Sequence, residues 1–243
     1  MRSPPLATLE ALFLDAGNTL IGMDLDLVCE LLARHGVAAT PDAVARAEAA
    51  ARPRLSRLLA TGLSSEARDT FAFHVANTLA RLGVPEARRM QVVLELARDM
   101  KAVGTRRLWS RVLPGVPQAL AELHAAGIKL AVVSNSDGTV EEGLERLGLR
   151  APLDAVLDST RVGVEKPDPR IFARALEVVG SLPARTAHVG DLFAVDVLGA
   201  RAAGLHGVLV DPYGDWCDEP CATTRDVPTL ARELLAARAS SSR

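Results

Sequence analysis

The sequence is poor in aromatic residues and cysteine. Its 243 residues include only five Phe, two Trp and one Tyr, so Leu, Val and Ala must supply most of the core. The three cysteines, Cys29, Cys217 and Cys221, are too few for a disulfide framework and are typical of a reducing compartment. Cys217 and Cys221 are four residues apart, but no second His or Cys pair accompanies them to complete a zinc site, so we interpret both as ordinary thiols.

The chain also lacks an excess of positive charge and any long apolar run. The formal net charge is -2 and the basic residues are scattered, which argues against a nucleic-acid or anionic membrane partner. No apolar run is long enough to cross a bilayer, and the first one is short and contains Asp15, unlike a signal peptide. We therefore expect a cytoplasmic protein with no nucleic-acid or membrane partner, and nothing in the sequence indicates an oligomeric state.

Short apolar runs rich in β-forming residues recur along the chain. They span residues 9–15, 128–135, 153–159, 186–191 and 207–212. Four of them are almost continuously apolar, as in parallel strands that are buried on both faces. Helical patterns separate the later runs, and several of these helices end in glycine. The alternation predicts an α/β fold with a doubly wound, parallel, five-stranded sheet.

A long segment between the first and second runs carries no strand signal. Its apolar residues recur with the period of a helix. One predicted helix, for example, places Met90, Val93, Ala97 and Met100 on one face. Pro53 is expected to kink or divide the helix in which it lies. We therefore predict a core of residues 1–21 and 111–243 and a helical insert of residues 22–110.

Polar residues cluster where the predicted strands end. Asp15 follows the first run, Ser134 and Asn135 end the second, Lys166 follows the third, Gly190 and Asp191 end the fourth, and Asp196 opens the next helix. Each residue alone could be a helix cap, a turn residue or a surface residue. Because the carboxyl ends of parallel strands meet at one edge of the sheet, we expect these residues to converge on a single site. Crowded carboxylates without nearby His or Cys suit Mg²⁺, and a lysine and a hydroxyl beside a metal suit a phosphate group.

Four segments resemble, in order, the motifs of the haloacid dehalogenase-like hydrolases. They are "LFLDAGNTL" (12–20), "AVVSNSDG" (131–138), "VEKPDPRIF" (164–172) and "HVGDLFAVDVLGARAAG" (188–204). The third and fourth are long and specific matches. The resemblance covers about residues 8–20 and 112–212 and implies a Rossmann-like core, with the insert placed where the family carries a helical cap of the first type (C1).

This resemblance implies a Mg²⁺-dependent hydrolase that acts on a small phosphorylated metabolite through an aspartyl-phosphate intermediate. The implied nucleophile is Asp15, and Ser134 and Lys166 would hold the phosphoryl oxygens during catalysis. The implied metal ligands are Asp15, Asp191, Asp196 and the carbonyl of Gly17, although Asp196 could instead support Lys166. The implied substrate-binding residues are Ala16, Gly17, Ser134, Asn135 and Lys166.

Gly17 departs from the family pattern, and Asn18 follows it where glycine is usual. The family's phosphatases usually carry a second aspartate at the position of Gly17, which protonates the leaving oxygen and later activates water. Glycine still offers its carbonyl to a metal but cannot transfer protons, and general acid–base catalysis is worth roughly 10²–10⁴ in rate. The sequence therefore predicts an atypical member.

Four interpretations remain open. We favour a Mg²⁺-dependent phosphatase because the acids of the fourth motif, Asp191 and Asp196, are retained. A carbon–halogen hydrolase also lacks the second aspartate, but such members lose these acids. A phosphonate carbon–phosphorus hydrolase needs a cap lysine, and residues 22–100 contain none, with Lys101 near the exit of the insert. The remaining alternative is a low-turnover protein that binds or senses a phosphorylated ligand.

Overall fold

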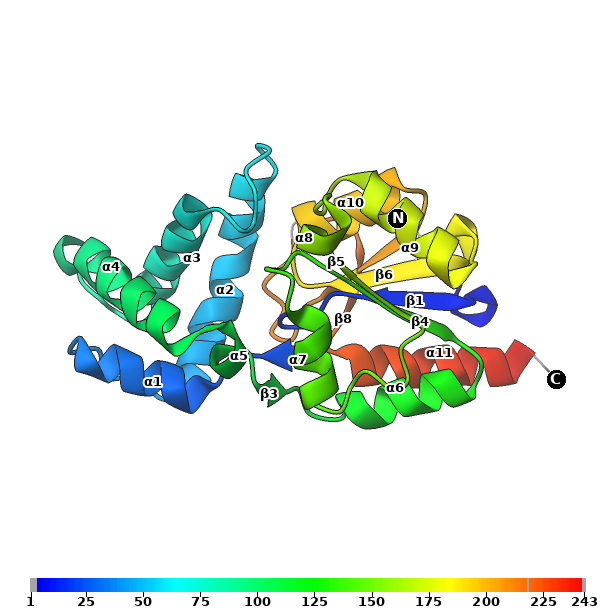
Figure 1. Cartoon of the computed structure of the whole chain (residues 1–243), viewed down its shortest axis with the longest axis horizontal. Helices are drawn as coiled ribbons and strands as arrows, with labels where there is room; N and C mark the ends of the chain where they lie inside the picture. Colours follow the sequence, from blue (N-terminus) through cyan, green and yellow to red (C-terminus); the bar gives the residue numbers. More distant parts are fainter. Residues whose placement is uncertain (1–3, 218, 242–243) are drawn as a thin grey trace. The chain divides into compact units, whose positions relative to one another are not determined.

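The computed structural model describes residues 4–217 and 219–241 and divides into two compact units (Figure 1). The core unit comprises Met1–Ile21 and Val112–Arg243, and the helical unit comprises Gly22–Arg111. The chain passes between them through two short strands, β2 (Ile21–Gly22) and β3 (Arg111–Val112), which pair with each other. No helix within the described ranges is both long and apolar enough to cross a bilayer.

A parallel six-stranded sheet forms the centre of the core unit, in the order β5-β4-β1-β6-β7-β8. Its strands are β1 (Ala11–Leu14), β4 (Lys129–Ser134), β5 (Ala155–Asp158), β6 (Thr186–Gly190), β7 (His206–Val210) and β8 (Ala222–Thr224). The register aligns Leu14 of β1 with Val132 of β4 and Val189 of β6. This register brings the carboxyl ends of β1, β4 and β6 to the same edge of the sheet.

The predicted α/β fold is confirmed, and each of the five predicted runs forms a strand of this sheet. The predicted strand number is wrong, because β8 adds a sixth strand beside β7. This strand has only three residues, "ATT", and follows a polar loop. It lacks the apolar run by which the other strands are recognised. Its strand conformation depends on pairing with β7, and no local sequence pattern predicts that pairing.

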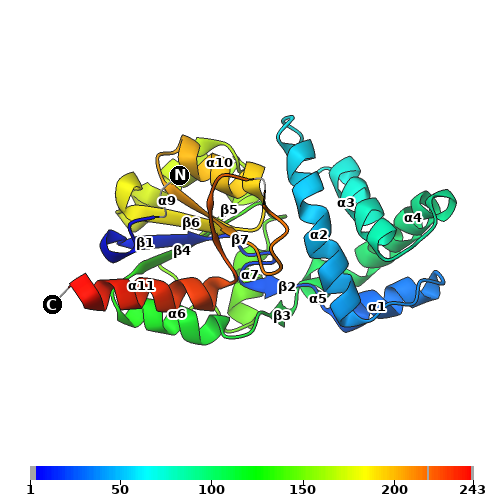
Figure 2. The same ribbon diagram turned by 180° about the vertical axis from the view of Figure 1, so that it is seen from behind.

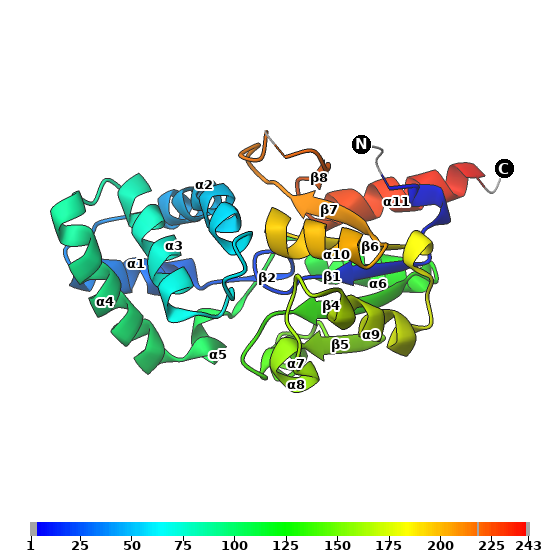
Figure 3. The same cartoon turned by 90° about the horizontal axis from the view of Figure 1, so that it is seen from above.

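Helices cover both faces of the sheet, with α9 and α10 on one face and α6 and α11 on the other (Figures 1 and 2). The helical elements of the core unit are η1 (Leu6–Thr8), α6 (Val116–Ala125), α7 (Val140–Arg146), α8 (Ser159–Val162), α9 (Pro169–Val179), η2 (Pro183–Arg185), the π-helical turn η3 (Phe193–Val197), α10 (Leu198–Ala202) and α11 (Val227–Ser241). Figure 3 shows η1 beside α11. The arrangement is the doubly wound layering that the sequence predicts.

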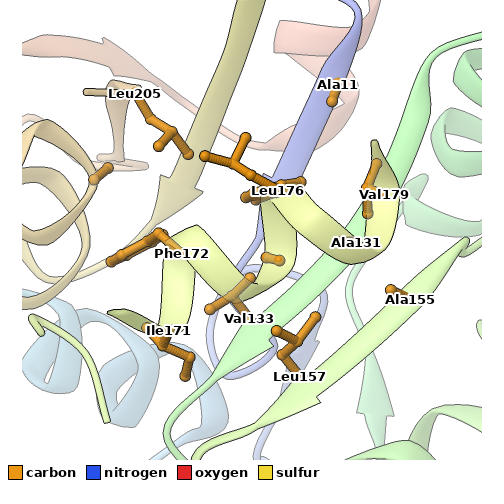
Figure 4. Close-up of a cluster of buried hydrophobic side chains, with 13 residues drawn as sticks. Ala11, Ala131, Val133, Ala155, Leu157, Ile171, Phe172, Leu176, Val179 and Leu205 are labelled. Atoms are coloured by element: carbon orange, nitrogen blue, oxygen red, sulfur yellow. The ribbon is translucent and has the colours of Figure 1, made fainter. Parts of the chain in front are cut away.

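Helix α9 shows how the local sequence specifies an element and its packing. Asp168 is the N-cap, because its carboxylate accepts a hydrogen bond from the Arg170 N–H at 2.9 Å, and Pro169 occupies the first turn. Gly180 ends the helix in the left-handed conformation, with φ 65°. Between these ends, the apolar face of α9 packs on β1, β4 and β5, where Phe172 is fully buried (Figure 4).

The helical unit consists of α1 (Leu25–Arg34), α2 (Pro41–Leu59), α3 (Arg68–Arg81), α4 (Glu86–Val103) and α5 (Thr105–Leu108). Pro53 lies inside α2 and does not divide it, contrary to one of the two outcomes expected from the sequence. Proline removes one hydrogen bond of the helix and crowds the preceding turn. The carbonyl that loses its helical donor is that of Ala49. The adjacent carbonyl of Ala50 accepts a hydrogen bond from Arg81 Nη2 at 2.6 Å, so α3 donates to the backbone of that turn.

The core of the helical unit is aliphatic and joins α1, α3 and α4. On α4 the buried residues are Val92, Val93 and Leu96, whereas Met90 is 57% exposed. Of the predicted face, Val93 is buried, Met100 packs against this core and Ala97 is half-buried, so only Met90 was wrongly placed. Several spacings of apolar residues fit a helix with many of them, and only packing selects the buried face.

A buried charged cluster joins α2 to α3. Glu48 and Arg52, one turn apart on α2, form an ion pair, and Arg52 Nε donates to the Glu48 carboxylate at 3.0 Å. His74 of α3 contacts Glu48 through Nε2 at 3.1 Å. Although burial alone would raise the pKa of Glu48, Arg52 and His74 lower it to about 2. Both members of the ion pair are over 90% buried, where removing one charge of a pair is costly.

We predict that Glu48→Gln lowers the free energy of unfolding of the helical unit by about 3 kcal/mol at pH 7, the usual cost of breaking a buried ion pair. The depressed pKa of Glu48 stabilises the folded state above its ordinary value of 4.5, and this stabilisation is lost as the pH falls toward 2. Urea unfolding between pH 7 and pH 3 should show a steeper acid loss in the native protein than in the variant.

Glu141→Gln is the matched control, because Glu141 contacts Arg150 at 2.9 Å in a pair whose side chains are each 31% exposed. An exposed pair contributes at most about 1 kcal/mol, so this variant should unfold nearly as the native protein does. Equal destabilisation by the two substitutions would contradict the role given to burial.

Candidate functional site

Asp15 lies directly after β1, at the carboxyl edge of the sheet. Its N–H donates to the carbonyl of Val189 in β6 at 2.8 Å, which ties its backbone to the neighbouring strand. Asp191 follows the end of β6, and Ser134 is the last residue of β4. All three side chains are largely buried. The parallel register therefore brings to one edge residues that are far apart in the sequence.

The ammonium group of Lys166 joins two of the carboxylates. Lys166 is 2% exposed, and its Nζ donates to Asp15 Oδ1 and to Asp196 Oδ1, both at 2.7 Å. Asn135 holds the backbone of this lysine: its Oδ1 accepts from Lys166 N at 2.7 Å, and its Nδ2 donates to Lys166 O at 2.9 Å. The amide of Asn135 thus holds the backbone of Lys166, and its predicted role in substrate binding stays a prediction.

The carboxylate of Asp196 accepts hydrogen bonds from three donors. Besides Lys166, these are His188 Nε2 at 3.0 Å and the N–H of Leu192 at 2.9 Å. Gly190 lies against this carboxylate so closely that a Cβ at that position would collide with it. The hydrogen bond from Lys166 agrees with the expectation that Asp196 supports Lys166. The role of Asp196 as a direct metal ligand stays a prediction.

The buried charges shift one another's pKa values. Burial raises the pKa of Asp15, and the charge of Asp196 adds to this, whereas Lys166 opposes it. Burial alone would also raise the pKa of Asp196, but Lys166 and the hydrogen bond from His188 hold it well below its usual range. The two carboxylates together outweigh the burial of Lys166 and raise its pKa, so it stays charged at neutral pH.

Two residues of the site were not identified from the sequence. His188 lies in β6, is fully buried and has its pKa lowered by burial, so the neutral ring donates Nε2–H to Asp196. An imidazole within an apolar strand is a signal that could have indicated it. Asn18 donates from Nδ2 to Asp191 Oδ2 at 3.1 Å, a contact between residues 173 positions apart that no local pattern predicts.

The remaining predicted residues lie around the same edge. Ala16 is buried, Gly17 is partly buried, and the Ser134 hydroxyl contacts the carbonyl of Asn135 at 3.4 Å. Within the described residues, no group of three His, Cys, Asp or Glu side chains forms a metal cluster. The metal ligands predicted from the sequence, Asp15, Asp191, Asp196 and the carbonyl of Gly17, are all oxygen donors, and such donors suit Mg²⁺.

Comparison with known proteins identifies relatives over most of the chain. A family model described as haloacid dehalogenase-like hydrolase matches residues 9–204. Haloacid dehalogenase-like hydrolase domain-containing protein 3 of Mus musculus is 42% identical over 153 residues, which cover 63% of this chain and 59% of that protein. Glyceraldehyde 3-phosphate phosphatase of Methanothermobacter thermautotrophicus is 40% identical over 102 residues, 42% of this chain and 45% of that protein.

The chain spans less than two thirds of the length of these curated relatives. Among solved structures, the magnesium-bound HAD-hydrolase YfnB of Bacillus subtilis has a TM-score of 0.61 at 20% identity, covering 93% of this chain and 98% of that one. At this identity the likeness shows the fold. The match of the family model, which spans most of the chain and all four motifs, shows that the protein belongs to the haloacid dehalogenase-like hydrolase family.

Proposed function

We propose that the protein is a Mg²⁺-dependent phosphatase in which Asp15 is the nucleophile. The observation that carries this proposal is the bridge from Asp15 through Lys166 to Asp196, built at the carboxyl edge of the sheet. A carboxylate at a strand end, partly exposed at 12% of its side chain and held by a buried ammonium group, is oriented to attack an electrophile. The same ammonium group stabilises negative charge on a phosphoryl group.

The proposed roles divide among the side chains of the core unit. Asp15 attacks phosphorus, the P–O bond to the substrate's leaving oxygen breaks, and water later hydrolyses the resulting aspartyl-phosphate to release phosphate. Lys166 and Ser134 hold the phosphoryl oxygens, while Asp196 and Asn135 keep Lys166 in place. Asp15, Asp191 and the carbonyl of Gly17 are the proposed ligands of Mg²⁺, which when bound would supply charge stabilisation to the phosphate.

The substrate class follows from the family and from the relatives named above. The archaeal relative is a glyceraldehyde 3-phosphate phosphatase, so a small phosphorylated metabolite is the proposed substrate here as well. The helical unit occupies the sequence position of the family's cap, and we assign substrate selection to it. A protein that binds a phosphorylated ligand without turnover is the competing function, and it is favoured by Gly17.

We predict that Asp15→Asn and Asp191→Ala each abolish Mg²⁺-dependent hydrolysis of p-nitrophenyl phosphate, because one removes the nucleophile and the other a proposed metal ligand. EDTA should have the same effect on the native protein. Asp168→Asn is the control, because the partly exposed carboxylate of Asp168 caps α9 and pairs with Arg170, and asparagine can still cap the helix. Turnover that survives EDTA and Asp191→Ala would refute the metal assignment, and native protein that binds phosphate without turnover would favour the binding function.

A second prediction concerns the leaving group. Without an acid at position 17, it must depart largely unprotonated, which costs little for aryl or acyl phosphates and much for alkyl phosphates. The native protein should therefore hydrolyse p-nitrophenyl or acetyl phosphate with a higher kcat/KM than simple alkyl phosphates. Gly17 is not among the described glycines with positive φ, so Gly17→Asp meets no backbone strain and should narrow this gap.

The measurement is kcat/KM for a series of aryl and alkyl phosphates with both proteins, after their folding has been checked by circular dichroism. The gap between the classes should shrink by roughly 10²-fold or more in Gly17→Asp, the lower end of what a general acid contributes. An unchanged dependence on the leaving group would show that another residue already supplies the proton.

A further inference from the structure

Asn18 has a backbone conformation that is unusual for its residue type. It has φ 54°, and it is the only residue other than glycine with positive φ in the described part of the chain. Asparagine tolerates this region better than most side chains, but glycine adopts it without steric cost. A glycine would therefore serve the backbone equally well, and a reason for the side chain must be sought in its contacts.

The side chain of Asn18 contacts the carboxylate of Asp191. Its Nδ2 donates to Asp191 Oδ2 at 3.1 Å, and Asp191 is only 5% exposed. The Asn18 N–H donates to the carbonyl of Ile21 at 2.6 Å, so the loop that carries the amide is itself held by its backbone. The hydrogen bond from the Asn18 side chain to Asp191 links the loop after β1 to the loop after β6. These two loops carry the proposed metal ligands.

An amide that donates to one carboxylate oxygen restricts rotation of the carboxylate. A carboxylate oxygen has two lone pairs, so the accepted hydrogen bond leaves that oxygen able to bind a cation. Ligands held by such hydrogen bonds bind metals more tightly, because their orientation is set before the metal arrives. An uncharged amide does this without adding to the negative charge of the site.

We propose that Asn18 is a positioning residue for the divalent cation site, because its amide orients the Asp191 carboxylate for metal binding. The inference rests on the proposed function only through its metal site, since Asp191 is a proposed Mg²⁺ ligand there. It assigns a role to the second of the two positions at which the chain departs from its family's first motif. Gly17 removes an acid from this loop, and Asn18 adds a neutral donor directed at Asp191.

The test measures Mg²⁺ binding to the full chain without any substrate. Native protein, Asn18→Gly and Asn18→Asp are stripped with EDTA, dialysed and titrated with MgCl₂ by calorimetry, and their Tm is followed over the same concentrations. Glycine removes the donor while accepting the positive φ. Aspartate keeps the size and the backbone preference but replaces the donor with a second carboxylate facing Asp191.

Asn18→Gly should fold like the native protein and bind Mg²⁺ about tenfold or more weakly, as substitutions of groups that orient metal ligands usually do. Asn18→Asp should have a lower metal-free Tm, because two carboxylates then face each other, and a larger rise in Tm with Mg²⁺, because the cation offsets their repulsion. If Asn18 only tied the two loops together, Asn18→Gly would lower the metal-free Tm and leave the affinity for Mg²⁺ unchanged.

Native affinity in Asn18→Gly would overturn the proposal, as would a failure of the native protein to bind Mg²⁺. A rise in Tm no larger in Asn18→Asp than in the native protein would also contradict it. The proposed function is tested separately, because a protein that binds Mg²⁺ through an Asn18-dependent site without hydrolysing phosphate esters would retain this inference and lose the phosphatase assignment.

Discussion

The buried ammonium group of Lys166 is the interaction on which the candidate site depends. A charged group that is 2% exposed loses most of its hydration, at a cost of several kcal/mol. Two carboxylates at 2.7 Å compensate for this loss, and they belong to residues 151 and 30 positions away along the chain. The lysine therefore allows the carboxylates of Asp15 and Asp196, which would otherwise repel each other, to lie close together.

The surrounding structure holds these three charges in place with few groups. Asn135 holds the backbone of Lys166 through both ends of its side-chain amide, and the hydrogen bond from Asp15 N–H to the carbonyl of Val189 joins the end of β1 to β6. Gly190 provides the space that the carboxylate of Asp196 occupies. Each of these groups comes from a strand end, so the precision of the site derives from the register of the sheet.

The sequence predicted those parts that depend on local pattern. Continuous apolar runs identified five strands, because strands buried on both faces exclude polar residues, and the four motifs identified the family. The sequence missed strand β8, allowed Pro53 as a possible helix end and placed Met90 on a buried face. All three features are decided by tertiary contacts. Arg81 supports the backbone before Pro53, and packing selects Val92 over Met90.

In the candidate site too, the sequence predicted residues that a local pattern marks and missed those that only tertiary contacts reveal. Asp15 could be identified from its place at a strand end and Lys166 from its motif, whereas the hydrogen bonds between Asn135 and the backbone of Lys166 could not be predicted. His188 was not identified, and Asn18 was recognised only as a departure from the first motif, because the contact that each makes, to Asp196 and to Asp191, has no local pattern. Such contacts join side chains that are far apart in the sequence, and no periodic pattern of residues predicts them.

The pairing of β2 with β3 has a consequence for the modularity of the protein. Because the two strands are neighbours, the helical unit leaves the core unit at Ile21 and returns at Val112 through adjacent strands. The hydrogen bond from Leu113 N–H to the carbonyl of Leu20 lies within the core unit and closes the junction from that side. The insert therefore begins and ends at one place in the core unit, so a change in its length need not alter the register of the sheet that builds the candidate site.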